Sequence, residues 1–223
     1  MPLYLALSLL HDINLQIWKV TEDIDFFSVD QEWYEREASW INSIHPKKRM
    51  DYLASRYILY KHLNPVQKLP IIKDEFGKLK FDREDQFLSI SHSGNYSSFV
   101  IGPKELGLDI QIYDSKILRI LPKFLSASEL ELVQSIDDLD RRLRIGILCW
   151  TAKEAIYKAH GKRGIQFNEQ IKINFDLLEL TGGSLSLQEQ TIDYKFTYGM
   201  EEEFAWLVAH HDEYNDDIRS EFM

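Results

Sequence analysis

Glu154 and Lys158 stand one helical turn apart in the segment from residue 150 to residue 164. The apolar residues around them recur at helical spacing, which predicts an amphipathic helix with this pair on its polar side. Those apolar residues are Leu148, Ala152, Ala155, Ile156 and Ala159. A carboxylate can bind a metal ion or accept a proton, and an ammonium can neutralise an anion. Because such a pair is more often a surface ion pair worth about 0.3–0.5 kcal/mol, a catalytic interpretation needs partners from elsewhere in the chain.

One partner is a strand predicted over residues 105–114, where apolar and polar residues alternate. Asp109 and Gln111 fall on the same face of this strand, and Gly107 leaves room beside them. Two oxygen-bearing side chains two residues apart can reach a single cation. The alternative is that this face is the solvent-exposed side of a half-buried sheet.

A second partner is the Ser91–Gly94 segment, which we expect to be a polar loop after a strand that begins at residue 87. Serine-rich loops that end in glycine offer hydroxyl and backbone N–H groups to anions, and His92 adds a possible positive donor. A Ser-His hydrolase is disfavoured because neighbouring residues of an extended segment point to opposite faces. The chain also has no Gly-x-Ser-x-Gly elbow.

These residues must be positioned by a mixed set of helices and strands. Apolar periodicity, turn residues and capping signals predict where the elements begin and end. They predict a buried strand over 1–10, a strand over 14–20, helices over 30–44 and 46–63, a loop over 65–70, a hairpin around Gly77, a helix that opens with a Ser126–Glu129 capping box, a long helix from Asp137 to Gly161, strands over 170–175, 184–187, 191–197 and 204–209 with a Gly182–Gly183 turn, and a frayed acidic tail from His210.

The helix that begins at Pro46 resembles the helix that carries Glu154. Residues 56–61 and 153–158 each have a basic residue followed four and five positions later by Tyr-Lys. Chance similarity between two amphipathic helices explains this about as well as an internal repeat does. A true repeat would make the chain two related halves with a cleft between them, where ligand sites are common.

Composition excludes several classes of protein. The net charge of −10 argues against non-specific binding of nucleic acid. The single cysteine, Cys149, cannot form an internal disulfide and is expected to fill space in the core, which fits a cytoplasmic protein. No apolar run approaches the roughly 20 residues that span a membrane, and the opening segment lacks the positive leader of a signal peptide.

Three motifs occur in an order that resembles the Sfp-like 4'-phosphopantetheinyl transferases. They are Phe87-Leu-Ser-Ile-Ser-His-Ser-Gly, Leu106-Gly-Leu-Asp-Ile-Gln and Trp150-Thr-Ala-Lys-Glu-Ala-Ile-Tyr-Lys-Ala-His-Gly. The Gly77-Lys78 turn and the helix from Pro46 match two weaker motifs, so the resemblance covers residues 46–164. It implies an α+β fold of two similar halves, here residues 1–103 and 104–223, related by a pseudo-twofold axis with the ligand site between them.

The resemblance also implies a function. Such enzymes transfer the 4'-phosphopantetheine arm of coenzyme A to a serine of an apo carrier protein, with Mg²⁺, and release adenosine 3',5'-bisphosphate. It assigns the metal to Asp109, Gln111 and Glu154, and catalysis to Glu154 and Lys158. The residues expected to bind the cofactor are Lys48, Arg56, Lys78, Ser91, His92, Asp109, Lys153 and Lys158. The partner would be an acyl, peptidyl or aryl carrier protein, and two fused halves would permit a monomer.

Two positions depart from the family pattern. Gln111 stands where the family often has an acidic residue, and Leu79 stands where proline commonly follows Gly-Lys. An amide oxygen can still coordinate a cation, but the site then carries one negative charge fewer. The alternative function is therefore a catalytically impaired paralogue that binds coenzyme A or a carrier protein. Whether Glu154 acts as a base or only as a metal ligand stays open at this point.

Overall fold

The computed structural model describes the chain except for residues 10–11, 29–31, 63–70, 83–84, 189 and 212–223. The predicted loop over 65–70 and most of the predicted tail lie outside the described residues. The strands are β1 (Leu3–Leu9), β2 (Ile13–Lys19), β3 (Ile71–Lys73), β4 (Leu79–Phe81), β5 (Phe87–Ser93), β6 (Tyr96–Gly102), β7 (Leu106–Ile112), β8 (Ile171–Asp176), β9 (Glu179–Ser186), β10 (Thr191–Met200) and β11 (Phe204–His211). The helices are α1 (Glu32–Ser43), α2 (Pro46–His62), α3 (Ile117–Phe124), α4 (Ala127–Gln134), α5 (Leu139–His160) and α6 (Phe167–Gln170), with a short 3₁₀ turn at Asp25–Ser28.

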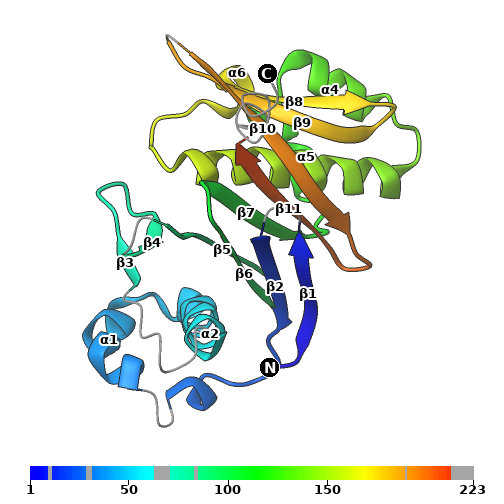
Figure 1. The fold of residues 1–223 in the computed structure, drawn as a ribbon. Helices are drawn as coiled ribbons and strands as arrows, with labels where there is room; N and C mark the ends of the chain where they lie inside the picture. Colours follow the sequence, from blue (N-terminus) through cyan, green and yellow to red (C-terminus); the bar gives the residue numbers. More distant parts are fainter. Residues whose placement is uncertain (10–11, 29–31, 63–70, 83–84, 189, 212–223) are drawn as a thin grey trace.

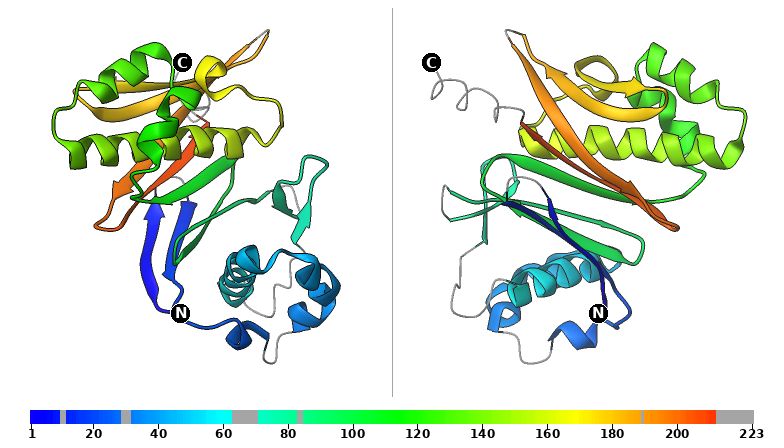
Figure 2. Two further views of the ribbon diagram at one scale, coloured as in Figure 1. Left: turned by 180° about the vertical axis from the view of Figure 1, so that it is seen from behind. Right: turned by 45° about the vertical axis from the view of Figure 1, so that its right-hand side comes forward.

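The strands form two large antiparallel sheets and a small two-stranded sheet of β3 and β4, which confirms the predicted α+β class with two sheet-bearing halves (Figure 1). The first sheet has the order β1-β2-β6-β5, and the second has the order β7-β11-β10-β9-β8. Helices α1 and α2 lie beside the first sheet, while the long helix α5 lies across the second (Figure 2). The chain passes from the first sheet to the second in the turn between β6 and β7.

The two halves share a hydrophobic core, which holds them together as one body. Leu15, Ile17 and Val100 of the first sheet pack against β7 and β11 of the second. In β11, Phe204, Trp206 and Val208 face that shared core, whereas Ala205, Leu207 and Ala209 face the core beneath α5. Period-2 alternation thus lets one strand serve two cores, because successive side chains point to opposite faces.

The edge strands of the two sheets meet along a ladder of serine hydroxyls instead of backbone pairs. The Oγ atoms of Ser89, Ser91 and Ser93 in β5 accept the N–H groups of Leu108, Ile110 and Ile112 in β7, at 2.9, 3.2 and 3.1 Å. Every second residue of each strand takes part, so the side chains of one strand satisfy backbone donors that an edge strand would otherwise leave unpaired. We refer to these three contacts as the serine ladder.

Helix α5 approaches β7 closely because Gly107 has no side chain. A Cβ atom at residue 107 would lie 2.0 Å from the carbonyl oxygen of Ala155 and 2.4 Å from the nitrogen of Ala159. The helix begins just after its predicted start at Asp137, capped by Asp138, which accepts from the N–H of Arg141, and it ends as predicted at Gly161 in the left-handed conformation. Gly107 therefore determines how near the helix comes to the face of β7 that carries Asp109.

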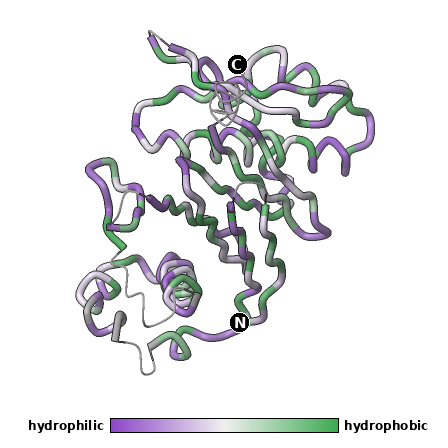
Figure 3. The backbone as a smooth tube through the Cα atoms, viewed as in Figure 1, coloured by the Kyte–Doolittle hydropathy of each residue, from purple (hydrophilic) through white to green (hydrophobic). Residues whose placement is uncertain are grey.

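Three local predictions were wrong. The opening strand is apolar (Figure 3) but not buried, since it lies at a sheet edge and its side chains alternate between exposed and half-buried. Residues 91–93 continue β5 instead of forming a loop, and the turn falls at Gly94. Gly182 and Gly183 lie within β9, where Cβ atoms would press on Tyr194 and Ile156, and the turn lies at Leu177–Leu178.

Candidate active site

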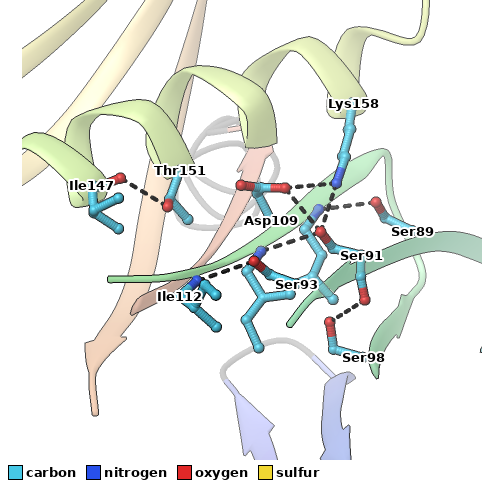
Figure 4. Close-up of polar contacts among 11 residues, drawn as sticks. Ser89, Ser91, Ser93, Ser98, Asp109, Ile112, Ile147, Thr151 and Lys158 are labelled. Carbon is cyan, nitrogen blue, oxygen red and sulfur yellow. Dashed lines mark hydrogen bonds and ion pairs between the residues drawn. The ribbon is translucent and has the colours of Figure 1, made fainter. Parts of the chain in front are cut away.

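Asp109, Ser91 and Lys158 meet where β7, β5 and α5 converge (Figure 4). The Nζ atom of Lys158 lies 2.7 Å from Oδ1 of Asp109 and donates to the hydroxyl of Ser91 at 2.8 Å. The Ser91 hydroxyl donates to the same Oδ1 at 2.8 Å. Three groups from separate elements therefore form a closed polar triangle. Asp109 is only 6% exposed, so its charge must be balanced by direct partners.

This placement decides between the two interpretations of the 105–114 strand. The polar face of β7 is buried under α5 at Gly107 and Asp109, although Gln111 further along the same face is partly exposed. Leu106, Leu108 and Ile110 occupy the opposite face and pack in the shared core, as the alternation predicted. Asp109 is thus a buried carboxylate at the junction of the halves, where an unpaired charge would be costly.

Glu154 completes a pair of carboxylates with Asp109. Burial and the neighbouring charge of Asp109 raise the pKa of Glu154 to about 7, and Lys158 opposes the shift. The ionised form is disfavoured because it places a second negative charge in a poorly solvated site. A cation held between the two carboxylates would relieve this repulsion.

The donor set suits a magnesium ion. Oδ2 of Asp109 is buried and accepts no hydrogen bond from any described residue, so one oxygen is available for a ligand. Within the described ranges no three or more acidic, histidine or cysteine side chains are grouped so that together they could hold a metal ion. Two carboxylates with space for other oxygen ligands are typical of Mg²⁺ sites, which commonly keep water and substrate phosphate oxygens. Gln111 follows Asp109 on the same face and is partly exposed.

A cavity of about 260 Å³ adjoins Lys158, between α5, β5 and the β3–β4 hairpin. Lys78 lines it from the hairpin, and Tyr157 and Lys158 line it from the helix. The Nζ atom of Lys78 donates to the carbonyl oxygen of Ala159 at 2.7 Å, near the carbonyl end of α5. Burial lowers the pKa of Lys78. The structure therefore places Lys78 and Lys158 at one cavity, with the Lys78 ammonium held by the helix end.

Three other predicted cofactor-binding residues lie in α2 or point toward it from β5. His92 points away from Ser91, as expected for neighbours in a strand, and its Nδ1 atom lies 3.5 Å from Oδ2 of Asp51 in α2. Arg56 is buried between α1 and α2, with Nε 3.5 Å from Glu37 and its guanidinium over the Tyr52 ring. Lys48 is exposed on the first turn of α2. The structure does not bring these side chains to the Asp109–Lys158 triangle.

The position of Lys153 in the core contradicts the prediction that this residue binds the cofactor. Its side chain is fully buried, and Nζ lies 2.7 Å from Oε2 of Glu129. It also donates to the carbonyl oxygens of Phe167 and Ile171 at 2.9 and 2.7 Å. Glu129 in turn accepts the N–H groups of Ser126 and Ile173. Lys153 thus joins α5 to α4 and β8, because helical spacing carries it to the side of the helix away from β7.

Replacing Lys153 by methionine should destabilise the protein by about 3–5 kcal/mol, because Glu129 would stay buried without its counter-ion. Urea unfolding measures this loss. Adding Glu129→Gln to Lys153→Met should recover much of the stability, because it removes the buried carboxylate that has lost its counter-ion. A stable Lys153→Met variant with weakened coenzyme A binding would show instead that Lys153 contacts the ligand.

Sequence reasoning missed the serine ladder and the partner of Lys153. The ladder had a signal, since Ser89, Ser91 and Ser93 alternate along one strand. Glu129 was recognised only as a capping residue, and the cap is present with both of its reciprocal hydrogen bonds. Its second role requires contacts with α5 and β8, which no local pattern predicts.

Comparisons with known proteins agree with this architecture. The family described as "4'-phosphopantetheinyl transferase superfamily" matches residues 105–215, which contain β7, α5 and the carboxylate pair. The protein "Putative 4'-phosphopantetheinyl transferase slr0495" of Synechocystis sp. is 31% identical over 117 residues, which span 49% of this chain and 47% of that protein. No described helix is both long and apolar enough to cross a membrane. The chain belongs to the 4'-phosphopantetheinyl transferase superfamily.

Proposed function

We propose that this chain transfers the 4'-phosphopantetheine moiety of coenzyme A to a serine of an apo carrier protein, in a Mg²⁺-dependent reaction that releases adenosine 3',5'-bisphosphate. The observation that supports it best is that Lys158, which lines a cavity between the halves, also contacts Asp109 and interacts electrostatically with Glu154. Two carboxylates can hold a divalent cation, and a lysine at the same place can neutralise a phosphate. The lone buried Cys149 fits the cytoplasm as the compartment.

In this proposal the protein works mainly by positioning and by charge. Attack of a hydroxyl on a pyrophosphate phosphorus requires alignment of the reactants and stabilisation of negative charge. Asp109 and Glu154 would hold the ion, which when bound would neutralise phosphate oxygens. Lys158 would contact the phosphates as a mobile point charge, and Ser91 would orient both Lys158 and Asp109 through its two hydrogen bonds.

Glu154 has a further possible role, because its pKa of about 7 allows it to gain or lose a proton near neutral pH. Such a carboxylate is suited to accept the proton of the attacking serine when no metal is bound to the accepting oxygen. Bound directly to Mg²⁺, it would be a weaker base and act chiefly as a ligand.

The direct test is to incubate the protein with coenzyme A, Mg²⁺ and a panel of apo acyl, peptidyl and aryl carrier proteins, and to measure the mass of each carrier. A gain of one phosphopantetheine on a carrier supports the proposal, and the responsive carrier identifies the partner class. A serine-to-alanine carrier is the matched control and should gain nothing. Coenzyme A binding without any mass gain would favour the impaired, ligand-binding paralogue.

Gln111 provides a second test, because it shares the strand face of Asp109. Replacing it by glutamate adds a carboxylate and should lower the Mg²⁺ concentration that gives half-maximal transfer, by several-fold. Titrating Mg²⁺ at saturating coenzyme A measures this value. Gln111→Asn keeps the amide and controls for any change in packing. An unchanged or higher Mg²⁺ requirement in Gln111→Glu would show that residue 111 is not near the ion.

A further inference from the structure

Lys158 occupies an unusual place for a residue expected to bind phosphate. Its Nζ atom contacts the carboxylate that is proposed to hold the metal, at 2.7 Å from Oδ1 of Asp109. Its side chain is 28% exposed whereas that of Asp109 is 8% exposed, so the lysine reaches inward from the cavity wall to a buried anion. Lys158 is therefore the counter-ion of Asp109.

The neighbouring cations are engaged elsewhere. Lys78 donates to the end of α5 and Lys153 pairs with Glu129. The site holds two carboxylates, since Asp109 and Glu154 interact electrostatically, and Lys158 is the cation that interacts with both. The second anchor of Lys158 is the Ser91 hydroxyl, which belongs to the serine ladder and is held in place by the N–H of Ile110.

We infer that Lys158 acts as a built-in counter-ion that competes with a divalent cation for the charge of Asp109, so that binding of the metal and binding of the coenzyme are coupled. This inference rests on the proposed function. A divalent cation and the ammonium compete for Asp109, because two cations sharing one carboxylate repel each other. With a cation held by Asp109, Lys158 would lose this partner and would be free to contact the phosphates of coenzyme A.

The coupling operates in both directions. A phosphate that draws Lys158 away from Asp109 leaves the carboxylate pair without a counter-ion and thereby raises its affinity for the metal. Linkage requires each ligand to improve the binding of the other by the same factor. The protein should therefore bind metal weakly alone and more tightly with coenzyme A.

The test is Mn²⁺ binding, measured by electron paramagnetic resonance at pH 8 with no carrier protein. Lys158→Gln should bind Mn²⁺ about tenfold more tightly than the unaltered protein in the absence of coenzyme A, which is the order expected when one charge-assisted contact no longer competes. Coenzyme A should tighten Mn²⁺ binding to the unaltered protein by several-fold, and this gain should be smaller in Lys158→Gln.

Two variants serve as controls. Lys162→Gln removes the same charge from an exposed residue just beyond the helix, so it should leave the Mn²⁺ affinity unchanged. Lys158→Arg keeps the positive charge and should bind Mn²⁺ as weakly as the unaltered protein. Thermal unfolding verifies that each variant is folded. If Lys158→Gln does not fold, Ser91→Ala removes one anchor of the lysine and should raise the affinity in the same direction.

Equal or weaker Mn²⁺ binding by Lys158→Gln would overturn the inference, and so would the absence of Mn²⁺ binding by every variant. Carrier loading is measured separately and decides the proposed function. A protein that shows the expected Mn²⁺ pattern but loads no carrier would refute the transferase activity while supporting the counter-ion role. A protein that loads carriers but lacks the Mn²⁺ pattern would support the transferase activity and refute the counter-ion role.

Discussion

Replacing Glu154 by glutamine should abolish nearly all phosphopantetheine transfer while making the free protein more stable at pH 8. Transfer should fall by at least about 10²–10³-fold, since a group that stabilises developing charge or holds the ion is lost. Stability should rise because the neutral amide removes a charge that burial and Asp109 both disfavour. Carrier mass analysis measures the first effect, and thermal unfolding without metal measures the second.

The pH dependence gives this prediction a definite sign. Glu154 ionises near pH 4.5 when unfolded and at about pH 7 when folded, so the folded protein holds the extra proton between these values. The stabilising effect of protonation is complete below pH 4.5 and is lost as the pH rises through 7. The advantage of Glu154→Gln should therefore be small at pH 5 and reach roughly 1–3 kcal/mol at pH 8.

Glu131→Gln is a suitable control, because it makes the same chemical change at an exposed position of α4. It should alter neither transfer nor the pH dependence of unfolding. A fully active Glu154→Gln variant would remove Glu154 from the chemistry. A variant that is inactive and also less stable at pH 8 would instead indicate general damage to the fold.

Gly107→Ala should give the second large effect, a loss of both stability and transfer from the addition of one methyl group. The new Cβ atom would lie 2.0 Å from a backbone oxygen of α5, and a clash with backbone cannot be relieved by rotating a side chain. We expect a destabilisation of about 3 kcal/mol or more, at the upper end for overpacking. Displacement of α5 would also move Glu154 and Lys158 away from Asp109 and lower transfer steeply.

The matched control is Gly146→Ala, which lies within α5 itself. There the added Cβ atom would meet only side-chain atoms, of Leu121 at 3.3 Å and of Leu118 at 3.7 Å. Alanine favours the helix by about 1 kcal/mol over glycine, which offsets a small repacking cost. Urea unfolding and carrier loading should show Gly146→Ala close to the unaltered protein. If Gly107→Ala is equally well tolerated, the close approach of α5 to β7 does not position the site.

Local signals in the sequence predicted the elements that carry the site. The capping box at Ser126, the acidic start at Asp137 and the glycine at 161 predicted, within about two residues, where α4 begins and where α5 begins and ends. These signals work because a cap is made within one turn of the chain. Alternation in 105–114 likewise predicted which side chains of β7 share the face of Asp109.

Long-range packing explains the predictions that failed. Gly182 and Gly183 have turn-like composition, yet they lie in β9 because neighbouring elements leave no room for side chains. The apolar opening strand was predicted to be buried, but strand order left it at an edge. Lysine side chains usually lie on the surface. The ammonium of Lys153 can nevertheless be buried, because three acceptors from other elements pair with it.

The sequence by itself determined which residues could act together, because strand alternation and helical spacing depend only on neighbours along the chain. It placed Asp109 on the polar face of a strand and set Glu154 one turn from Lys158. Only the tertiary structure decided which of these charges touch. Lys158 reaches Asp109 and Ser91, whereas Lys153, five residues earlier, lies in the core with Glu129. The physical reason is that buried charges are stable only beside partners, and those partners come from strands and helices far away in sequence.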